Sequence, residues 1–165
     1  MSYKTINFNY EEYESKEALN SLDREILEHA LVAVTHASAQ FSHFHVGVAA
    51  RLSDGSIHMG SNKENTSITN CAEQSLLLHL HTINNKSAIN TIAVTFKNMN
   101  PNTTSDFPIT PCGKCRQLLL EDEQAKGSPM RIIMAGQSGK IFIANSALSM
   151  LPLAYGVNFL QHIKD

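Results

Sequence analysis

Apolar residues recur at helical spacing in three stretches of the chain. The first stretch follows Ser21 and Asp23, either of which can cap a helix, and carries Ile26, Leu27, Ala30, Leu31, Val34 and Ala37. Residues three or four apart share one helix face, so this spacing predicts an amphipathic helix over 21–39. Residues 71 to about 84 and 113 to about 123 predict two further helices.

Five shorter segments, rich in β-branched and apolar residues, predict strands. They are 44–52, 57–61, 89–96, 131–135 and 140–144. Four turn-type residues separate the first two segments, and four more separate the last two, so both pairs are predicted to form antiparallel hairpins. The near-continuous apolar run at 89–96 is typical of a central strand.

In chain order these elements give an α/β pattern, α-β-β-α-β-α-β-β-α. This order predicts a three-layer α/β/α sandwich around a mixed five-stranded sheet. A chain of 165 residues suits one domain, which we expect over 20–165. Residues 1–19 are interpreted as an N-terminal extension with room for a short edge strand. The tail, 145–165, is expected to fold back as a helix plus coil.

Composition narrows the classes of partner. The net charge is −2, which is not the basic character of a protein that binds a nucleic-acid polymer. No apolar run reaches the length that spans a bilayer, so no membrane partner is expected. The first residues lack the apolar segment of a secretory signal. We therefore expect a cytoplasmic protein.

All three cysteines fall in two motifs, Cys71-Ala72-Glu73 and Pro111-Cys112-Gly113-Lys114-Cys115. Each motif stands where the chain enters a predicted helix, and a helix N-terminus favours the thiolate, the form that binds metal. Three thiolates can hold one Zn²⁺ and leave its fourth position open for water. Glu73 is close enough to Cys71 to carry protons there.

This pattern is the signature of zinc deaminases with Cys71 in place of a histidine. The alternative is a structural zinc site or a set of buried thiols. A closed structural site needs a fourth ligand, and none of the eight histidines has ligand spacing to the cysteines. The paired motifs with Glu73 therefore favour a catalytic site.

Several motifs together resemble the cytidine deaminase family. Residues 41–47 (Phe-Ser-His-Phe-His-Val-Gly) are similar to its Tyr-Ser-x-Phe-x-Val-Gly, and residues 60–65 (Gly-Ser-Asn-Lys-Glu-Asn) to its Gly-x-Asn-x-Glu-Asn. The two cysteine motifs follow, and residues 151–155 (Leu-Pro-Leu-Ala-Tyr) are similar to its C-terminal Leu-Leu-Pro-x-x-Phe. The resemblance extends from about residue 22 to residue 156.

The resemblance implies zinc-dependent hydrolytic deamination of free cytidine or deoxycytidine, a reaction of pyrimidine salvage. It implies one Zn²⁺ per subunit, held by Cys71, Cys112 and Cys115, with Glu73 as the catalytic proton carrier. It also implies a homo-oligomer, with a tetramer favoured and a dimer as the alternative.

The resemblance further assigns contacts to a pyrimidine nucleoside. The ribose 3′-hydroxyl, the base carbonyl, the ring face and the leaving amino group would each have a partner in the protein. Asn62 and Glu64 would contact the ribose 3′-hydroxyl, and the Ala72 N–H would bind the base carbonyl. Phe44 would pack on the ring face, and the Thr110 carbonyl would face the leaving amino group. Tyr155 would add an aromatic wall in its own or a neighbouring subunit's site.

Two features depart from the family pattern. Gln74 stands where Cys-ligated members usually carry an arginine that hydrogen-bonds the thiolates, and three thiolates on Zn²⁺ leave a charge of −1. We hypothesise that the helix N-termini and Arg116 supply the compensation. The stretch 65–70 is also short, as in blasticidin S deaminases. Two alternatives therefore stay open: the same chemistry on another aminopyrimidine nucleoside such as blasticidin S, and an inactive zinc-bound nucleoside-binding homologue.

Overall fold

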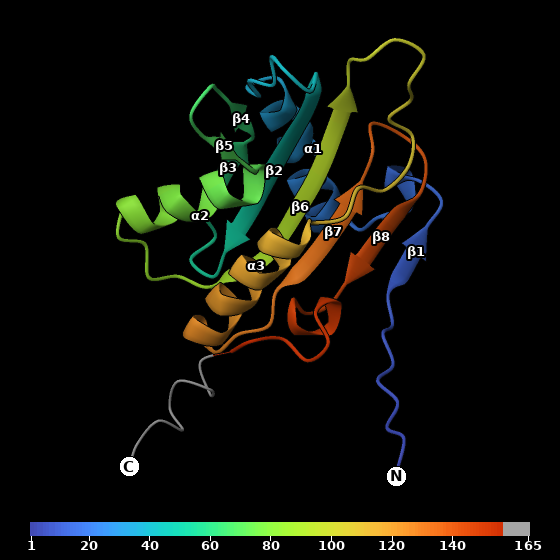
Figure 1. Ribbon diagram of the computed structural model, residues 1–165, viewed down its shortest axis with the longest axis vertical. Helices are drawn as coiled ribbons and strands as arrows, with labels where there is room; N and C mark the ends of the chain where they lie inside the picture. The colour runs from blue at the N-terminus through green and yellow to red at the C-terminus, as the bar shows by residue number, and fades with distance from the viewer. Residues whose placement is uncertain (157–165) are drawn as a thin grey trace.

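A six-stranded mixed sheet runs through the centre of the protein (Figure 1). The computed structural model describes residues 1–156. The strand order is β1-β8-β7-β6-β2-β3. The strands are β1 (Glu11–Tyr13), β2 (Phe44–Leu52), β3 (Ile57–Ser61), β6 (Ile89–Asn98), β7 (Arg131–Ala135) and β8 (Ile141–Ala144), and a separate small sheet pairs β4 (Lys63–Glu64) with β5 (Thr69–Asn70).

The order and direction of the strands confirm the expected mixed sheet. β6 is central, antiparallel to β2 and parallel to β7. The pairs β2–β3 and β7–β8 are antiparallel hairpins, as the short linkers predicted. The parallel pair β6–β7 requires a crossover, and helix α3 (Gly113–Lys126) provides it.

The expected count of five strands was wrong, because the N-terminal extension contributes a sixth. β1 pairs antiparallel with β8, with Glu11 opposite Ile143. Its sequence, Glu-Glu-Tyr, has no apolar alternation, and a charged contact adds to the pairing with β8. The Arg131 guanidinium donates from Nη1 and Nη2 to the two carboxylate oxygens of Glu11, at 2.8 and 2.9 Å.

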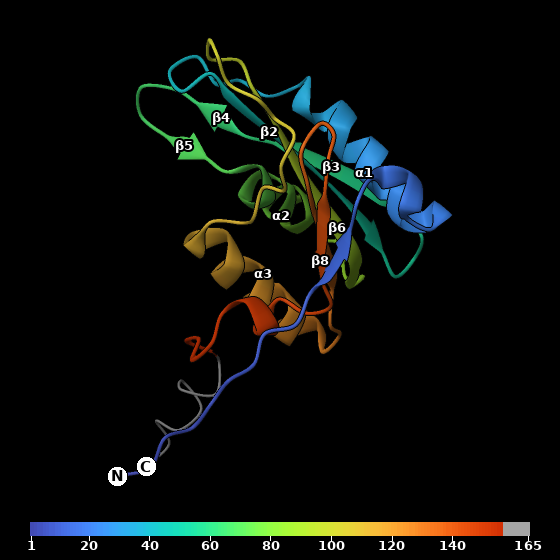
Figure 2. The ribbon, with the colours of Figure 1, turned by 90° about the vertical axis from the view of Figure 1, so that its right-hand side faces the viewer.

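Helices cover both faces of the sheet, which gives the predicted three layers (Figure 2). Helix α1 (Ser21–Val34) lies on one face, and α2 (Ala72–Thr82) lies with α3 on the other. Asn20, rather than Ser21 or Asp23, caps α1 by accepting a hydrogen bond from the Asp23 N–H. α1 also ends before residue 39, because the Ser38 backbone pairs with Asn62 and Glu64 instead of continuing the helix.

Two glycines let the helices approach the sheet closely. A Cβ at Gly47 would lie 2.4 Å from the Val34 nitrogen of α1. A Cβ at Gly60 would lie 2.7 Å from the Ala72 oxygen and 2.8 Å from the Leu76 nitrogen of α2. No larger residue fits without movement. Gly60 thus fixes the distance between β3 and the first turns of α2.

The tail contains less helix than expected in its described part. A short 3₁₀ helix spans Leu148–Met150, residues 151–156 form turns and coil, and the last part of the predicted tail, 157–165, lies outside the described residues. The buried Glu123 carboxylate holds this turn by accepting hydrogen bonds from the Ala147 N–H and the Ser146 hydroxyl, at 2.8 and 2.7 Å. Among residues 1–156, no helix is long and apolar enough to cross a membrane.

Candidate active site

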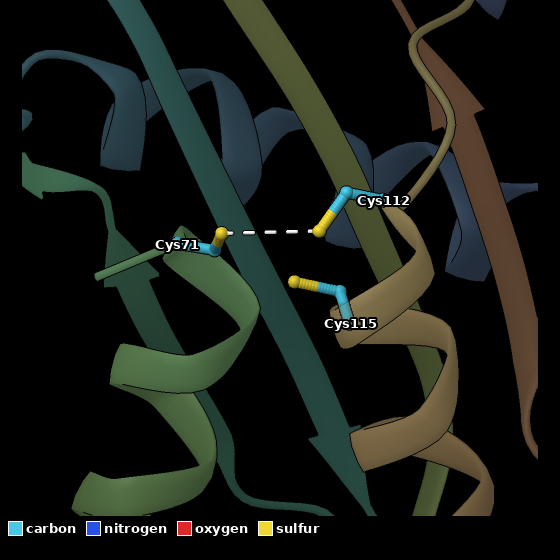
Figure 3. Close-up of side chains that lie close together, drawn as sticks. All are labelled: Cys71, Cys112 and Cys115. Carbon is cyan, nitrogen blue, oxygen red and sulfur yellow. Dashed lines mark hydrogen bonds between the residues drawn. The ribbon is translucent and has the colours of Figure 1, made fainter. Parts of the chain in front are cut away.

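Three cysteines from two helix N-termini point toward one another (Figure 3). Cys71 is the N-cap of α2, Cys112 is the N-cap of α3, and Cys115 lies in the first turn of α3. Their Sγ atoms all lie within 4.8 Å of one another, and those of Cys71 and Cys112 are 4.0 Å apart. Tetrahedral Zn–S bonds of about 2.3 Å place sulfurs about 3.8 Å apart. The three thiols therefore fit one zinc ion.

The three thiols lie in different surroundings. Cys112 is exposed, Cys71 is half-buried and Cys115 is buried. Burial raises the pKa of the Cys71 and Cys115 thiols. Burial also opposes ionisation of Cys112, but hydrogen bonds from the Cys115 N–H and from the other two thiols outweigh it and lower the Cys112 pKa.

Glu73 stands in the first turn of α2 and is almost fully buried, with 4% of its surface exposed. Burial raises the pKa of its carboxyl, because the charged form loses water. The carboxyl also interacts with the Cys115 thiol. A raised pKa makes the carboxylate a stronger base, which suits a group that takes up and passes on a proton.

A pocket of about 210 Å³ opens beside these groups. Most of the site residues predicted from the sequence line it: Phe44, Asn62, Cys71, Ala72, Glu73, Thr110 and Cys112. It also includes Thr69, Asn70 and Ile109, which the sequence reasoning missed although they adjoin Cys71 and Thr110. The pocket combines apolar walls with a few converging polar groups, as small-molecule sites do.

Residues 20–126 match the family described as the cytidine and deoxycytidylate deaminase zinc-binding region. The match spans more than half of the chain and contains all three cysteines and Glu73. The chain belongs to this deaminase family.

Individual relatives agree with the family. The chain is 35% identical to a cytidine deaminase of Halalkalibacterium halodurans over 103 residues, which are 61% of this chain and 72% of that protein. It is 34% identical to a cytidine deaminase of Mycobacterium tuberculosis over 56% of this chain and 65% of the relative. The crystal structure of a Burkholderia pseudomallei cytidine deaminase matches with a TM-score of 0.68 at 30% identity, covering 79% of this chain and 97% of that one.

Within this deaminase fold, Asn62 connects the pocket to the sheet. Its Oδ1 accepts a hydrogen bond from the Val46 N–H at 2.8 Å, and its Nδ2 donates to the Phe44 carbonyl at 2.9 Å. The Phe44 ring stacks on Phe96 with centroids 4.8 Å apart. Both side chains therefore have structural contacts as well as positions in the pocket wall.

Glu64 and Tyr155 lie outside the lining of this pocket. The Glu64 carboxylate accepts hydrogen bonds from the Phe41 and Ser42 N–H groups at 3.1 and 3.0 Å. Tyr155 is 57% exposed, and its carbonyl accepts from the Gln117 side chain at 2.9 Å. The nucleoside contacts assigned to these two residues stay predictions.

Arg116 and Gln74 were expected to act around the metal ligands. Among the described residues, the Arg116 guanidinium donates only to oxygens, namely the Pro111 carbonyl at 2.8 Å, the Met150 carbonyl and the Thr110 hydroxyl. It therefore braces the loop before α3. Gln74 accepts a hydrogen bond from Lys114 at 2.7 Å, a contact that the sequence analysis did not foresee.

Proposed function

We propose that this protein hydrolyses free cytidine and deoxycytidine to uridine or deoxyuridine and ammonia, as an enzyme of pyrimidine salvage. The observation that carries the proposal is the convergence of three thiols beside a pocket that two of them, Cys71 and Cys112, line together with the buried carboxyl of Glu73. The relatives named cytidine deaminase support the same reaction.

Cys71, Cys112 and Cys115 would hold one Zn²⁺ per subunit. In residues 1–156 they form the one group of at least three Cys, His, Asp or Glu side chains placed to share an ion. When bound by three ligands, Zn²⁺ lowers the pKa of a water molecule at its open position. The two helix N-termini add partial positive charge beside the thiolates.

Glu73 would move the protons of the reaction. Its carboxylate takes a proton from the attacking water and delivers it to N3 of the base, and a second transfer lets ammonia leave from C4. The balance is one water consumed and one ammonia released for each nucleoside. Burial supports this role, because it raises the pKa of the carboxyl and shields it from bulk water.

The pocket wall supplies groups that suit a pyrimidine. The Ala72 N–H at the start of α2 would donate to the base carbonyl. The Thr110 carbonyl would accept from the amino group that leaves, and the Phe44 ring would cover one face of the base. All three residues line the pocket. Asn62 and Glu64 would contact the ribose 3′-hydroxyl.

We propose a homo-oligomer, a tetramer in preference to a dimer, for two reasons. The pocket of one chain is about 210 Å³, below the roughly 300 Å³ at which ligand sites usually begin. Tyr155 is an exposed aromatic residue that could enter a neighbouring subunit's site. A cytoplasmic location is proposed as well, because free cysteines such as these three persist in a reducing compartment.

The substrate test uses zinc-loaded protein with cytidine, deoxycytidine and blasticidin S, with ultraviolet absorbance and ammonia release followed in parallel. We expect turnover of cytidine and deoxycytidine. Release of ammonia from blasticidin S alone would contradict the proposed substrate and assign the short segment 65–70 as the specificity element. Bound zinc with no ammonia from any of the three would contradict the proposal and favour an inactive nucleoside-binding homologue.

The short segment 65–70, on which the blasticidin alternative depends, shapes one wall of the pocket. Residues 65–68 form a tight turn in which the Asn65 side chain accepts from the Ser67 and Ile68 N–H groups, at 3.1 and 2.7 Å. The turn joins β4 to β5, and β5 contributes Thr69 and Asn70 to the pocket wall. The shortened stretch thus determines part of the shape that a substrate meets.

A further inference from the structure

A hydrogen bond joins the two helices that carry the three cysteines. The Lys114 ammonium donates to Oε1 of Gln74 at 2.7 Å. Lys114 lies between Cys112 and Cys115 in the first turn of α3, and Gln74 lies one turn after Cys71 in α2. The contact therefore spans the same gap between the helices as the metal site does.

Zinc binding changes the charge at this place. Three neutral thiols that bind Zn²⁺ release three protons, and the resulting group carries a net charge of −1. A nearby positive charge favours the bound state, and groups around the ligands commonly tune metal affinity. Arg116 is the other cation in this turn of the sequence, but its described hydrogen bonds all go to oxygens of the loop and the tail.

An exposed lysine contributes little while its side chain moves freely, because water and salt screen its charge. Lys114 is exposed, but its ammonium is held by the amide of Gln74. A neutral partner fixes the ammonium without cancelling its charge. A carboxylate at position 74 would fix it equally well and cancel the charge.

We propose that Lys114, held by Gln74, is a positioning cation that offsets the negative charge of the three-thiolate zinc site. The inference rests on the zinc site of the proposed function. It also gives a role to Gln74, which departs from the family pattern. Lys114 of α3 supplies the positive charge, and Gln74 of α2 holds the ammonium in place.

The test measures zinc affinity of the full-length protein by competition with a chelator at fixed neutral pH. Lys114→Gln removes the charge and keeps a hydrogen-bonding side chain, whereas Lys114→Arg keeps the charge. Gln74→Glu keeps an acceptor for Lys114 and adds a negative charge. We expect Lys114→Gln and Gln74→Glu each to weaken zinc binding roughly ten-fold, the lower end of the usual effect of such groups. Lys114→Arg should stay within about three-fold of the unaltered protein.

Lys126→Gln is the matched control. Lys126 also joins α3 to the segment after α2, through the Asn85 carbonyl at 3.3 Å, but at the opposite end of α3 from the cysteines. Its loss should leave zinc affinity unchanged. The sulfur-to-metal absorption of Co²⁺-loaded variants checks that all three thiolates still bind.

Unaltered zinc affinity in Lys114→Gln and Gln74→Glu would overturn the inference, and so would an equal loss in Lys126→Gln. A loss in Lys114→Arg as large as in Lys114→Gln would also contradict it, because the charge would then be irrelevant. The readout is independent of turnover. If zinc binds and cytidine is not deaminated, the proposed function fails while this inference is still tested.

Discussion

Asn62 illustrates how one side chain can serve the fold and the pocket at once. Its amide satisfies the N–H of Val46 and the carbonyl of Phe44, two backbone groups of β2. Only 8% of Asn62 is exposed. The amide therefore stabilises the start of β2 in the pocket wall, independently of any contact with a ribose.

Replacing Asn62 with Ala should cost stability as well as binding. Two part-buried backbone groups would lose their partners, at a cost of about 1–3 kcal/mol in the free energy of unfolding. Urea denaturation measures this loss, and a raised KM for cytidine should accompany it. Asn90→Ala, at an exposed position of β6, serves as the control and should change the free energy by less than about 0.5 kcal/mol. An Asn62→Ala protein as stable as the control would contradict a stabilising role of these two hydrogen bonds.

At this scale the sequence predicted the residues whose chemistry depends on spacing along the chain. Cys112 and Cys115 share one helical turn, and Cys71 and Glu73 another, so their proximity within each motif follows from the spacing, while their roles stay predictions. The hydrogen bond between Gln74 and Lys114 could not be predicted in the same way. It joins residues 40 positions apart, and it depends on how the two helices meet on the sheet.

At the scale of elements, Gly60 lets the first turns of α2 lie close to β3. The first turns of α2 pack so tightly on β3 that a Cβ at Gly60 would overlap backbone atoms of Ala72 and Leu76. Backbone atoms cannot move aside as a flexible side chain can. The position of Ala72 and Glu73 in the pocket thus depends on the absence of a side chain on the neighbouring strand.

Gly60→Ala should therefore damage the site and the fold together. Displacement of α2 from β3 is expected to cost about 1–3 kcal/mol, the usual penalty of overpacking. Thermal unfolding gives the stability change, and ammonia release gives the loss of turnover. Gly55→Ala adds the same methyl group at a turn where the Cβ meets nothing within 4 Å. The Gly55 variant is expected to lose stability through its positive φ while turnover at low temperature persists, and equal loss of turnover in both would contradict the argument.

The elements that the pattern predicted poorly are those that tertiary contacts define. α1 carries apolar helical spacing as far as Ala37, yet it ends at Val34 because the Ser38 backbone pairs with Asn62 and with Glu64 of β4. β1 has no strand pattern. It joins the sheet by pairing with β8, and an ion pair between Glu11 and Arg131 adds to this pairing. β6, by contrast, is apolar on both faces and was predicted as central from its sequence alone.

For the molecule as a whole, Arg131 of β7 connects the N-terminal strand β1 with helix α1. Its guanidinium bonds Glu11 of β1 and, through Nε at 3.1 Å, the buried Asp23 of α1. The hydrogen bond from Arg131 lowers the pKa of Glu11 from its usual 4.5 to about 2. The folded protein therefore binds the proton of this carboxyl less readily than the unfolded chain does.

Because the pKa of Glu11 differs between the folded and unfolded states, the free energy of unfolding depends on pH. The contribution of Glu11 is fully present above about pH 4.5 and is lost as the pH falls toward 2, because the unfolded state takes up the proton first. Since the carboxylate is partly exposed, we expect about 1 kcal/mol in the free energy of unfolding. Glu11→Gln should lack this acid-dependent part in urea titrations across the range. Glu14→Gln, which removes only a loose 3.7 Å contact with Lys140, should retain it. Parallel pH curves for the unaltered protein and Glu11→Gln would contradict the account.

The central claim is that three thiols and Glu73 together form a hydrolytic zinc site. The most direct measurement is zinc content and ammonia release from cytidine, made side by side on the unaltered protein and on Glu73→Gln. We predict about one zinc per chain in both proteins, and a fall in turnover of about 10²-fold or more in the variant, because the proton carrier is lost. Near-normal turnover in Glu73→Gln with zinc bound would contradict the account.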